Sequence, residues 1–337
     1  MADVLLFVPI IIALLVSFFL MSFWIRKAHQ IGLIWDDMNK IKAPKVAGSG
    51  GIIAVLSFVL AVLLFVAYRV FIVNTTDYVI ESFALLTVIL LAAAIGLIDD
   101  LFGWQHGGLS RKSRLVLLIF ASIPLMVINA GQNVVSIPGF GEVSLGILYS
   151  LIVIPVGIVG CTTTFNFLAG FNGLESGQGI ILLSSLSLVA FLTGNPWLAI
   201  VGLCMVASLV GFIFFNLYPA KVFPGDVLTY AVGSLIAVIS IIGNFERIAV
   251  FFFIPYVLEV ILKSRGKLVK QSFGLPQKDG SLKMRYDKVY GLEHLSIYLQ
   301  EKLGMKVTEQ RVVYSIWLFQ LVIILIGLII FKSSLVI

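Results

Sequence analysis

Apolar residues dominate the chain in long blocks, and short polar stretches separate these blocks. A helix needs about 20 apolar residues to cross a bilayer, so the blocks predict membrane-spanning helices. We expect ten of them, at residues 3–25, 49–73, 78–98, 115–129, 147–168, 177–193, 197–217, 227–243, 248–263 and 313–331. The predicted fold class is therefore all-α, a polytopic integral membrane protein that forms one domain over residues 1–337.

The composition excludes an ordinary soluble domain. Of the 337 residues, 60% are apolar and 12% are charged, whereas soluble domains have about 45–50% apolar and about 25% charged residues. The two cysteines, Cys161 and Cys204, both lie inside apolar blocks. They are expected to be small core residues, and they provide neither a disulfide framework nor a zinc site.

The basic residues predict the orientation in the membrane. If Met1 lies outside, all of the 23 Lys and Arg residues except Arg69, Arg247 and Lys332 lie on the inside. The positive-inside rule then predicts both termini outside and a cytoplasmic set of loops at 26–48, 99–114, 166–176, 218–226 and 264–312. The net charge of +6 follows from this topology and requires no nucleic acid, and it suits anionic lipids or phosphates.

Two adjacent acids, Asp99 and Asp100, end the third predicted helix on the inside, in the string AIGLIDDLFG. A helix C-terminus disfavours each negative charge by about 0.3–1 kcal/mol. Either the two carboxylates are solvated at the membrane boundary, or cations hold them. The candidate cations are Arg111, Lys112 and Arg114, or a metal with its phosphate ligand.

A glycine-rich string, NFLAGFNGLESGQG, begins at Asn166 on the same face. It interleaves four glycines with the polar residues Asn172, Glu175 and Gln178. A tight loop would need only one or two glycines, so this density favours a backbone that closely approaches a polar ligand.

Asp226 stands where the eighth predicted helix begins. As an N-cap it would stabilise that helix by about 1 kcal/mol. It also faces the same side as Asn166 and the acidic pair, and carboxylate and amide oxygens suit a magnesium ion that bridges substrate phosphates. Zinc, copper and iron are disfavoured because no paired histidines or thiols accompany these oxygens; His29, His106 and His294 are scattered over three loops.

Local turn and helix signals mark three further loops. Residues 131–146 predict a short hairpin or loop outside, and Lys278-Asp279-Gly280 predicts a hairpin inside. The leucines of 292–303 recur at helical spacing before Gly304 and predict an interfacial helix. The basic run from Lys263 to Lys270 suits either lipid anchoring or phosphate binding.

Five strings together resemble one known family. They are DDMNK at 36–40, GLIDDLFG, FNFLAGFNGLESGQG at 165–179, NLYPAKVFPGDVLTY at 216–230 and KDGSLKMRYDKVYG at 278–291. In order and spacing the chain resembles the polyprenyl-phosphate N-acetylhexosamine-1-phosphate transferases. The likeness is greatest to the eukaryotic and archaeal branch, which transfers GlcNAc 1-phosphate from UDP-GlcNAc to dolichyl phosphate as the first step of lipid-linked glycan assembly for N-glycosylation.

The resemblance implies roles for particular residues. Asn166 and Asp226 would hold Mg²⁺, with Mn²⁺ as a substitute, while Asp99 and Asp100 would be a general base or an electrostatic organiser. Lys112 or Arg114 would bind the lipid phosphate. The implied substrate-binding residues are Asp36, Asp37, Met38, Asn39, Lys45, Asn172, Glu175, Asn216, Lys267 and Lys270.

The implied partners are UDP-GlcNAc, dolichyl or another polyprenyl phosphate, the bilayer and a second copy in a homodimer. The implied location is the plasma membrane of a prokaryote or the ER membrane of a eukaryote, with the active site cytoplasmic. The chain departs from the animal enzymes at Lys45, where they carry a glutamate, and at 267–271, where a lysine-containing run replaces an Arg/His-rich stretch. The identity of the transferred N-acetylhexosamine is therefore left open.

A transporter or flippase of an anionic lipid or nucleotide sugar is the alternative from another class. It would need charged residues near the middle of several spans or broken helices in paired halves. The charged residues inside the predicted spans, such as Arg69, Glu81 and Glu259, lie toward helix ends, and only Gln320 is a mid-span amide. The sequence therefore favours a transferase.

Overall fold

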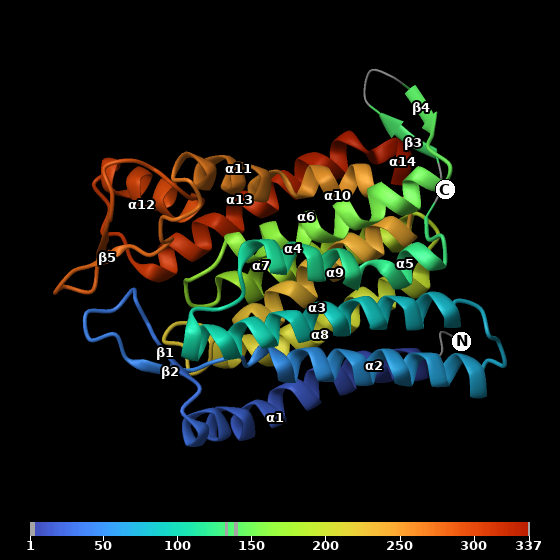
Figure 1. Cartoon of the computed structure of the whole chain (residues 1–337), viewed down its shortest axis with the longest axis horizontal. Helices are drawn as coiled ribbons and strands as arrows, with labels where there is room; N and C mark the ends of the chain where they lie inside the picture. Colours follow the sequence, from blue (N-terminus) through green and yellow to red (C-terminus); the bar gives the residue numbers. More distant parts are fainter. Residues whose placement is uncertain (1–3, 132–133, 138–140, 336–337) are drawn as a thin grey trace.

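Long helices lie side by side in the computed structural model, which describes residues 4–131, 134–137 and 141–335 (Figure 1). Within these residues, eight helices are long and apolar enough to cross a membrane. They are α1 (Val8–Ile31), α2 (Gly51–Phe71), α3 (Val79–His106), α6 (Ile154–Phe167), α7 (Leu174–Leu192), α8 (Pro196–Asn216), α9 (Gly225–Ile242) and α13 (Glu309–Ile330). Short helices η1 (Val4–Phe7), η2 (Tyr149–Val153) and α14 (Lys332–Leu335) adjoin α1, α6 and α13. The chain is thus an integral membrane protein.

The two remaining predicted spans are each broken into two helices. Residues 115–129 correspond to α4 (Arg111–Ala121) and α5 (Ile123–Val127), and residues 248–263 to α10 (Glu246–Phe252) and α11 (Ile254–Arg265). In both places a proline, Pro124 or Pro255, stands near the start of the second helix, and proline cannot donate a helical hydrogen bond. The expectation of ten continuous spans is therefore wrong at these two.

The third helix is longer than expected, because α3 continues to His106. Asp99 and Asp100 consequently lie inside the helix and not at its C-terminal end. The expectation that the helix dipole disfavours their charge at a C-terminus is therefore wrong. Groups on neighbouring elements must stabilise the two charges.

Three short antiparallel ribbons accompany the helices. β3 (Val134–Ile137) pairs with β4 (Gly141–Ser144), and β5 (Leu275–Pro276) pairs with β6 (Leu282–Lys283), at the two predicted hairpins. β1 (Ile34–Asp36) pairs with β2 (Lys45–Ala47) in the first loop, where no strands were expected. The predicted interfacial helix is α12 (Leu292–Lys302), and Gly304 follows it with a positive φ of 69°.

The helix α9 lies at the centre of the bundle. Every residue from Val227 to Ile241 is buried, and α9 packs against α3 and α6. The outer helices instead expose large apolar side chains: Phe19 of α1 is 67% exposed and Ile329 of α13 is 75% exposed. Such surfaces suit contact with lipid tails.

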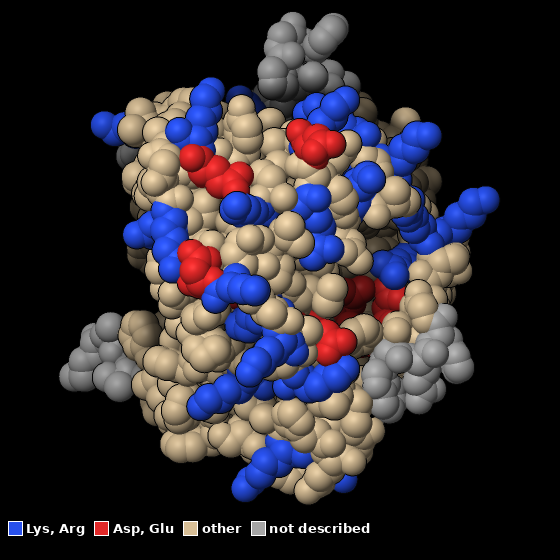
Figure 2. All heavy atoms as spheres, turned by 90° about the vertical axis from the view of Figure 1, so that its left-hand side faces the viewer, with Lys and Arg blue, Asp and Glu red and all other residues tan. Residues whose placement is uncertain are grey.

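The two ends of the bundle differ. Both termini and β3–β4 lie at one end, while β1–β2, β5 and α12 lie at the other, called here the loop end (Figure 1). Figure 2 views the loop end and shows Lys and Arg side chains over much of it, with acidic side chains inside a hollow. The predicted cytoplasmic loops thus gather on one basic face.

Helix packing beside α9 generates a first prediction. Gly96 of α3 lies so close to α9 that a β-carbon there would be 2.4 Å from the Asp226 carbonyl oxygen, whereas a β-carbon at Gly160 of α6 would meet nothing within 4 Å. We expect Gly96→Ala to lose about 1–3 kcal/mol of stability, seen as a lower midpoint of thermal unfolding in detergent. Gly160→Ala should lose none. Equal midpoints for the two variants would contradict this packing.

Candidate active site

A cavity of about 550 Å³ lies at the loop end, where α3, α6, α7 and α9 meet the first loop. Among the residues predicted from the sequence, its lining includes Asp36, Asp37, Met38, Asp100, Asn166, Glu175, Asn216 and Asp226. The other predicted residues lie outside this lining: Asp99, Lys112, Arg114, Asn39, Lys45, Asn172, Lys267 and Lys270. The structure therefore brings together the acidic and amide residues of four distant segments.

Asp100 holds the start of α9. Its Oδ1 accepts a hydrogen bond from the Asp226 N–H at 2.8 Å, and its Oδ2 accepts hydrogen bonds from the Ser49 hydroxyl at 2.9 Å and the Val227 N–H at 3.4 Å. The first N–H groups of a helix lack helical partners and attract negative charge. Gly225 permits this approach, because a β-carbon there would lie 2.2 Å from Asp100 Oδ2.

The side chain of Asp226 does not cap α9, although its position in the sequence suggested that it would. The N-cap of α9 is Pro224, and no side chain of that helix caps its own start. The carboxylate of Asp226 is 27% exposed and lines the cavity. The N-cap interpretation of Asp226 is therefore wrong, since Asp100 of α3 performs that function.

Asn166 stands beside Asp226 in the same cavity. Thr229, in the first turns of α9, donates a hydrogen bond from its hydroxyl to Asn166 Oδ1 at 3.1 Å. Both Thr229 and Asn166 line the cavity with Asp226. One carboxylate and one amide oxygen, from α9 and α6, thus face a common space.

Asp99 lies behind the cavity and pairs with Arg114. The guanidinium Nε of Arg114 is 2.7 Å from Asp99 Oδ2, and the Leu109 N–H donates to Asp99 Oδ1 at 2.7 Å. Arg114 Nη1 also lies 4.0 Å from Asp226 Oδ2. The charge of Asp99 is therefore balanced by a cation, as one of the two sequence interpretations required.

Of the three basic residues at the start of α4, Arg114 is the one whose side chain reaches the acids of the site. Lys112 is exposed, and Arg111 donates to the Leu268 carbonyl at 2.9 Å, away from the acids. Partial burial alone would lower the pKa of Arg114, but Tyr230, Asp99 and Asp226 outweigh it and hold that pKa above its ordinary value. Arg114 is accordingly a permanent positive charge beside the cavity.

The donor set fits a magnesium ion. The negative charges of Asp99 and Asp100 disfavour a further negative charge on Asp226, whereas the positive charge of Arg114 favours it. The described residues contain no group of three or more His, Cys, Asp or Glu side chains arranged to hold a metal. Mg²⁺ usually binds through one or two carboxylates together with waters and substrate phosphates, and Asp226 could supply the carboxylate, with the Asn166 amide in the same lining.

A second polar cluster, around Lys40, holds the first loop in place. Lys40 forms an ion pair with Asp37 and another with Glu309 at 3.0 Å, and its ammonium lies 3.1 Å from Asn172 Oδ1. Asn172 donates to Asp37 at 3.2 Å from its side chain and to Glu309 at 2.8 Å from its backbone. The side chain of Asn172 also accepts a hydrogen bond from the Ala220 N–H at 2.8 Å.

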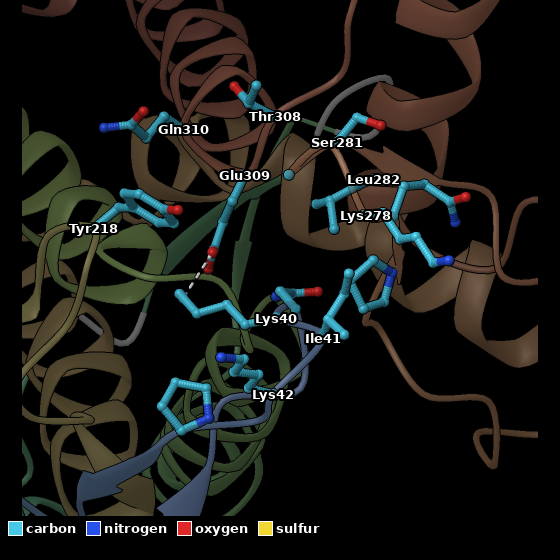
Figure 3. A pocket seen from close by; sticks show the side chains of 15 residues that line it. Lys40, Ile41, Lys42, Tyr218, Lys278, Ser281, Leu282, Thr308, Glu309 and Gln310 are labelled. Atoms are coloured by element: carbon cyan, nitrogen blue, oxygen red, sulfur yellow. Dashed lines mark hydrogen bonds and ion pairs between the residues drawn. The ribbon is translucent and has the colours of Figure 1, made fainter.

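Figure 3 shows the far side of this cluster, where Glu309 at the start of α13 points toward Lys40. The two residues form one wall of a separate cleft of about 470 Å³. Lys42 and Lys278 line the cleft too, from the first loop and the β5–β6 turn. Lys40 thus lines this cleft and also pairs with Asp37, which lines the first cavity.

Three other predicted residues mainly connect loops. Asn39 donates to the Gly170 carbonyl at 2.9 Å and accepts from the Gly274 N–H at 3.1 Å. Asn216, 1% exposed, donates to the Val222 carbonyl at 2.9 Å and accepts from Ser176 at 2.7 Å. Glu175 accepts from the Gly170 N–H at 2.9 Å.

The three lysines predicted to bind substrate, Lys45, Lys267 and Lys270, do not line the cavity, although Lys45 pairs with Asp36 of its lining. Lys45 pairs with Asp36 across β1–β2 at 2.8 Å, and both side chains are well exposed. Lys270 lies over the ring of Tyr286 at 4.9 Å, and Lys267 is exposed. Among the histidines, His29 is exposed, whereas His294 is buried, and burial lowers its pKa. The side chain of His106 lies outside the described residues.

Sequence reasoning missed Glu309, and it expected Lys263 in a basic run for phosphate or lipid but not in its contact beside Asn166. Glu309 is the first residue of α13 and reaches back across the chain to Lys40. Lys263 donates to the Phe167 carbonyl beside Asn166. The available signal was an acid or a base at the inner end of an apolar block, a place where an unpaired charge is costly.

Comparison with known proteins identifies the family. The model of glycosyl transferase family 4 matches residues 82–244, a range that contains Asp99, Asn166 and Asp226. A protein of Saccharolobus solfataricus, provisionally named UDP-N-acetylglucosamine--dolichyl-phosphate N-acetylglucosaminephosphotransferase, is 34% identical over 333 residues, or 98% of each chain. The chain belongs to glycosyl transferase family 4. The resemblance seen in the sequence motifs is thereby confirmed.

Members of family 4 differ in the names of their substrates. The UDP-N-acetylglucosamine--dolichyl-phosphate N-acetylglucosaminephosphotransferase of Dictyostelium discoideum is 31% identical, over 73% of this chain and 67% of its own length. A phospho-N-acetylmuramoyl-pentapeptide-transferase of Streptococcus thermophilus is 34% identical over 56% of this chain and 58% of its own. Two archaeal relatives that cover 98% and 91% of this chain, from Saccharolobus solfataricus and Sulfolobus acidocaldarius, are both named for N-acetylglucosamine and dolichyl phosphate.

The Lys40 cluster generates a second prediction. Lys40→Met leaves the carboxylates of Asp37 and Glu309, each 3% exposed, without their cation. Removing one partner of a buried ion pair costs about 3–5 kcal/mol, so we expect a clear fall in the midpoint of thermal unfolding. Adding Glu309→Gln should restore part of the loss. Lys42→Met, at an exposed neighbour, is the control, and a midpoint of Lys40→Met equal to that of Lys42→Met would refute the role of the cluster.

Proposed function

We propose that this protein transfers N-acetylglucosamine 1-phosphate from UDP-GlcNAc to dolichyl phosphate or another polyprenyl phosphate, releasing UMP. The proposal is supported by relatives of that name and by one observation above all. Asn166 and Asp226, 60 residues apart in sequence, line a single cavity beside a permanently charged arginine. Such a cavity suits a pyrophosphate and an attacking phosphate.

In the proposed reaction, an oxygen of the lipid phosphate attacks the β-phosphorus of UDP-GlcNAc. A new phosphorus–oxygen bond forms, and the bond from the β-phosphorus to the oxygen that bridges the two phosphates breaks, so that UMP leaves. Phosphoryl transfer depends mainly on positioning and charge stabilisation. Asn166 and Asp226 would hold Mg²⁺ or Mn²⁺, which would neutralise the pyrophosphate and the departing UMP.

Arg114 is proposed to hold the lipid phosphate, because Lys112 is exposed and farther along the surface. Asp99 orients the Arg114 guanidinium through its 2.7 Å contact. A phosphate monoester is already largely ionised near pH 7, so a general base contributes less than the positioning of charges. Asp100 has its oxygens occupied by the start of α9, and we assign it the positioning of Asp226.

The loop end is proposed to face the cytoplasm, in the plasma membrane of a prokaryote or the ER membrane of a eukaryote. The positive-inside rule supports this orientation, since Lys and Arg cover much of that end (Figure 2). Lipid phosphate would then reach the cavity from the inner leaflet, and UDP-GlcNAc would enter from the cytoplasm.

A transfer assay tests the function. Purified protein in detergent, given UDP-GlcNAc, Mg²⁺ and dolichyl phosphate, should release UMP in step with a GlcNAc-pyrophosphoryl lipid seen by mass spectrometry. Asp226→Ala should abolish both products, whereas Asp99→Asn should retain measurable activity at high pH, where the lipid phosphate is fully ionised. Asp279→Asn, on the exposed β5–β6 turn, should be unaffected.

Two results would overturn these assignments separately. A wild-type protein that releases no UMP under any of these conditions would be a transporter or another kind of membrane protein. A near-normal turnover of Asp226→Ala would leave the transfer reaction intact but remove Asp226 from the proposed metal site. Supplying a mixture of UDP sugars in the same assay identifies the sugar from the mass of the lipid product.

A further inference from the structure

Lys263, near the end of α11, joins three segments at the back of the cavity. Its ammonium donates to the Phe167 carbonyl and to the Ser272 hydroxyl, the latter at 2.9 Å, and it pairs with Glu259 Oε1 at 3.2 Å. The ammonium also lies 5.7 Å from the centre of the Phe167 ring. The Lys263 side chain is only 13% exposed, so these contacts are shielded from water.

The contact with Phe167 matters because Phe167 follows Asn166 directly. Helix α6 ends at Phe167, and Leu168 leaves the helical conformation with φ −87° and ψ 78°. The last carbonyls of a helix have no helical partner, and a cation near them is favourable. Lys263 therefore fixes the final turn of α6, from which the Asn166 amide projects toward the cavity.

Lys263 is itself held by a pair of buried glutamates. Glu259 and Glu293 are both fully buried, and Glu259 Oε2 accepts the Leu292 N–H at 2.6 Å. Two carboxylates facing one ammonium would leave an excess negative charge in a dry site. Burial, together with the nearby Glu259 charge, raises the pKa of Glu293 well above its ordinary value. The ammonium of Lys263 pairs with Glu259 at 3.2 Å, whereas burial disfavours the charged form of Glu293.

We propose that Lys263 is a positioning residue for transfer: it holds the end of α6 so that Asn166 can bind the divalent cation together with Asp226. Glu259 keeps the ammonium in place through its ion pair at 3.2 Å. The inference rests on the proposed function, because it takes Asn166 as a metal ligand. Residues that orient a ligand in this way typically contribute about 10–100-fold to metal affinity or activity.

The test measures metal binding apart from turnover. Binding of UMP with Mg²⁺ stabilises only the folded protein, so the midpoint of thermal unfolding should rise with Mg²⁺ concentration in the presence of UMP. We expect Lys263→Met to need about 10-fold more Mg²⁺ for half of that rise and for half-maximal transfer, with the KM for dolichyl phosphate unchanged. Lys288→Met is the matched control, because Lys288 is an exposed lysine in the loop between α11 and α12. This variant should behave as the wild type.

Further variants separate positioning from folding. Lys263→Gln can still donate one hydrogen bond to Phe167, so it should lie between the wild type and Lys263→Met. Glu259→Gln removes the carboxylate that pairs with Lys263 and should raise the Mg²⁺ requirement, whereas Glu293→Gln leaves that ion pair intact and should keep the wild-type requirement. If Lys263→Met does not fold, the Mg²⁺ requirement is measured on Lys263→Gln and Glu259→Gln in its place.

The outcomes distinguish this inference from the function on which it rests. If Lys263→Met and Lys263→Gln lower the basal midpoint but leave the Mg²⁺ requirement unchanged, Lys263 has a structural role only and the inference is overturned. If the wild type shows no Mg²⁺-dependent rise with UMP but still transfers the sugar phosphate, the metal assignment fails. If the wild type does neither, the proposed function itself fails.

Discussion

A buried carboxylate at the start of the central helix is the constraint on which the site depends. Asp100 of α3 accepts hydrogen bonds from the Asp226 and Val227 N–H groups of α9 and from Ser49 before α2. Three segments far apart in sequence are thereby fixed to one another at a point just inside the loop end. Because Asp100 satisfies the helix start, the side chain of Asp226 is left facing the cavity.

Three basic side chains form ion pairs with four other acids at the loop end. Arg114 balances Asp99, Lys40 balances Asp37 and Glu309, and Lys263 balances Glu259. Buried charges are tolerated only when they are paired, so each pair also ties one loop to another. These four ion pairs hold the loop end around Asn166 and Asp226, which line one cavity.

The sequence predicted what depends on local pattern. Hydropathy located the spans, and the glycine-rich string and Asp226 marked the cavity. Contacts between distant residues escaped prediction: the Lys40–Glu309 pair spans 269 positions, and no local pattern relates such residues. The capping of α9 by Asp100 was missed because Asp226 itself satisfied the N-cap rule. The prolines of α5 and α11 could have indicated broken spans, but the apolar run masked them.

The central claim is that α6 and α9 share one divalent cation through Asn166 and Asp226. Electron paramagnetic resonance of Mn²⁺ with UDP-GlcNAc present tests it most directly, because it counts bound metal without turnover. We expect one tightly bound Mn²⁺ per chain in the wild type and its loss in both Asn166→Ala and Asp226→Asn. Undiminished Mn²⁺ binding in either variant would contradict the shared site.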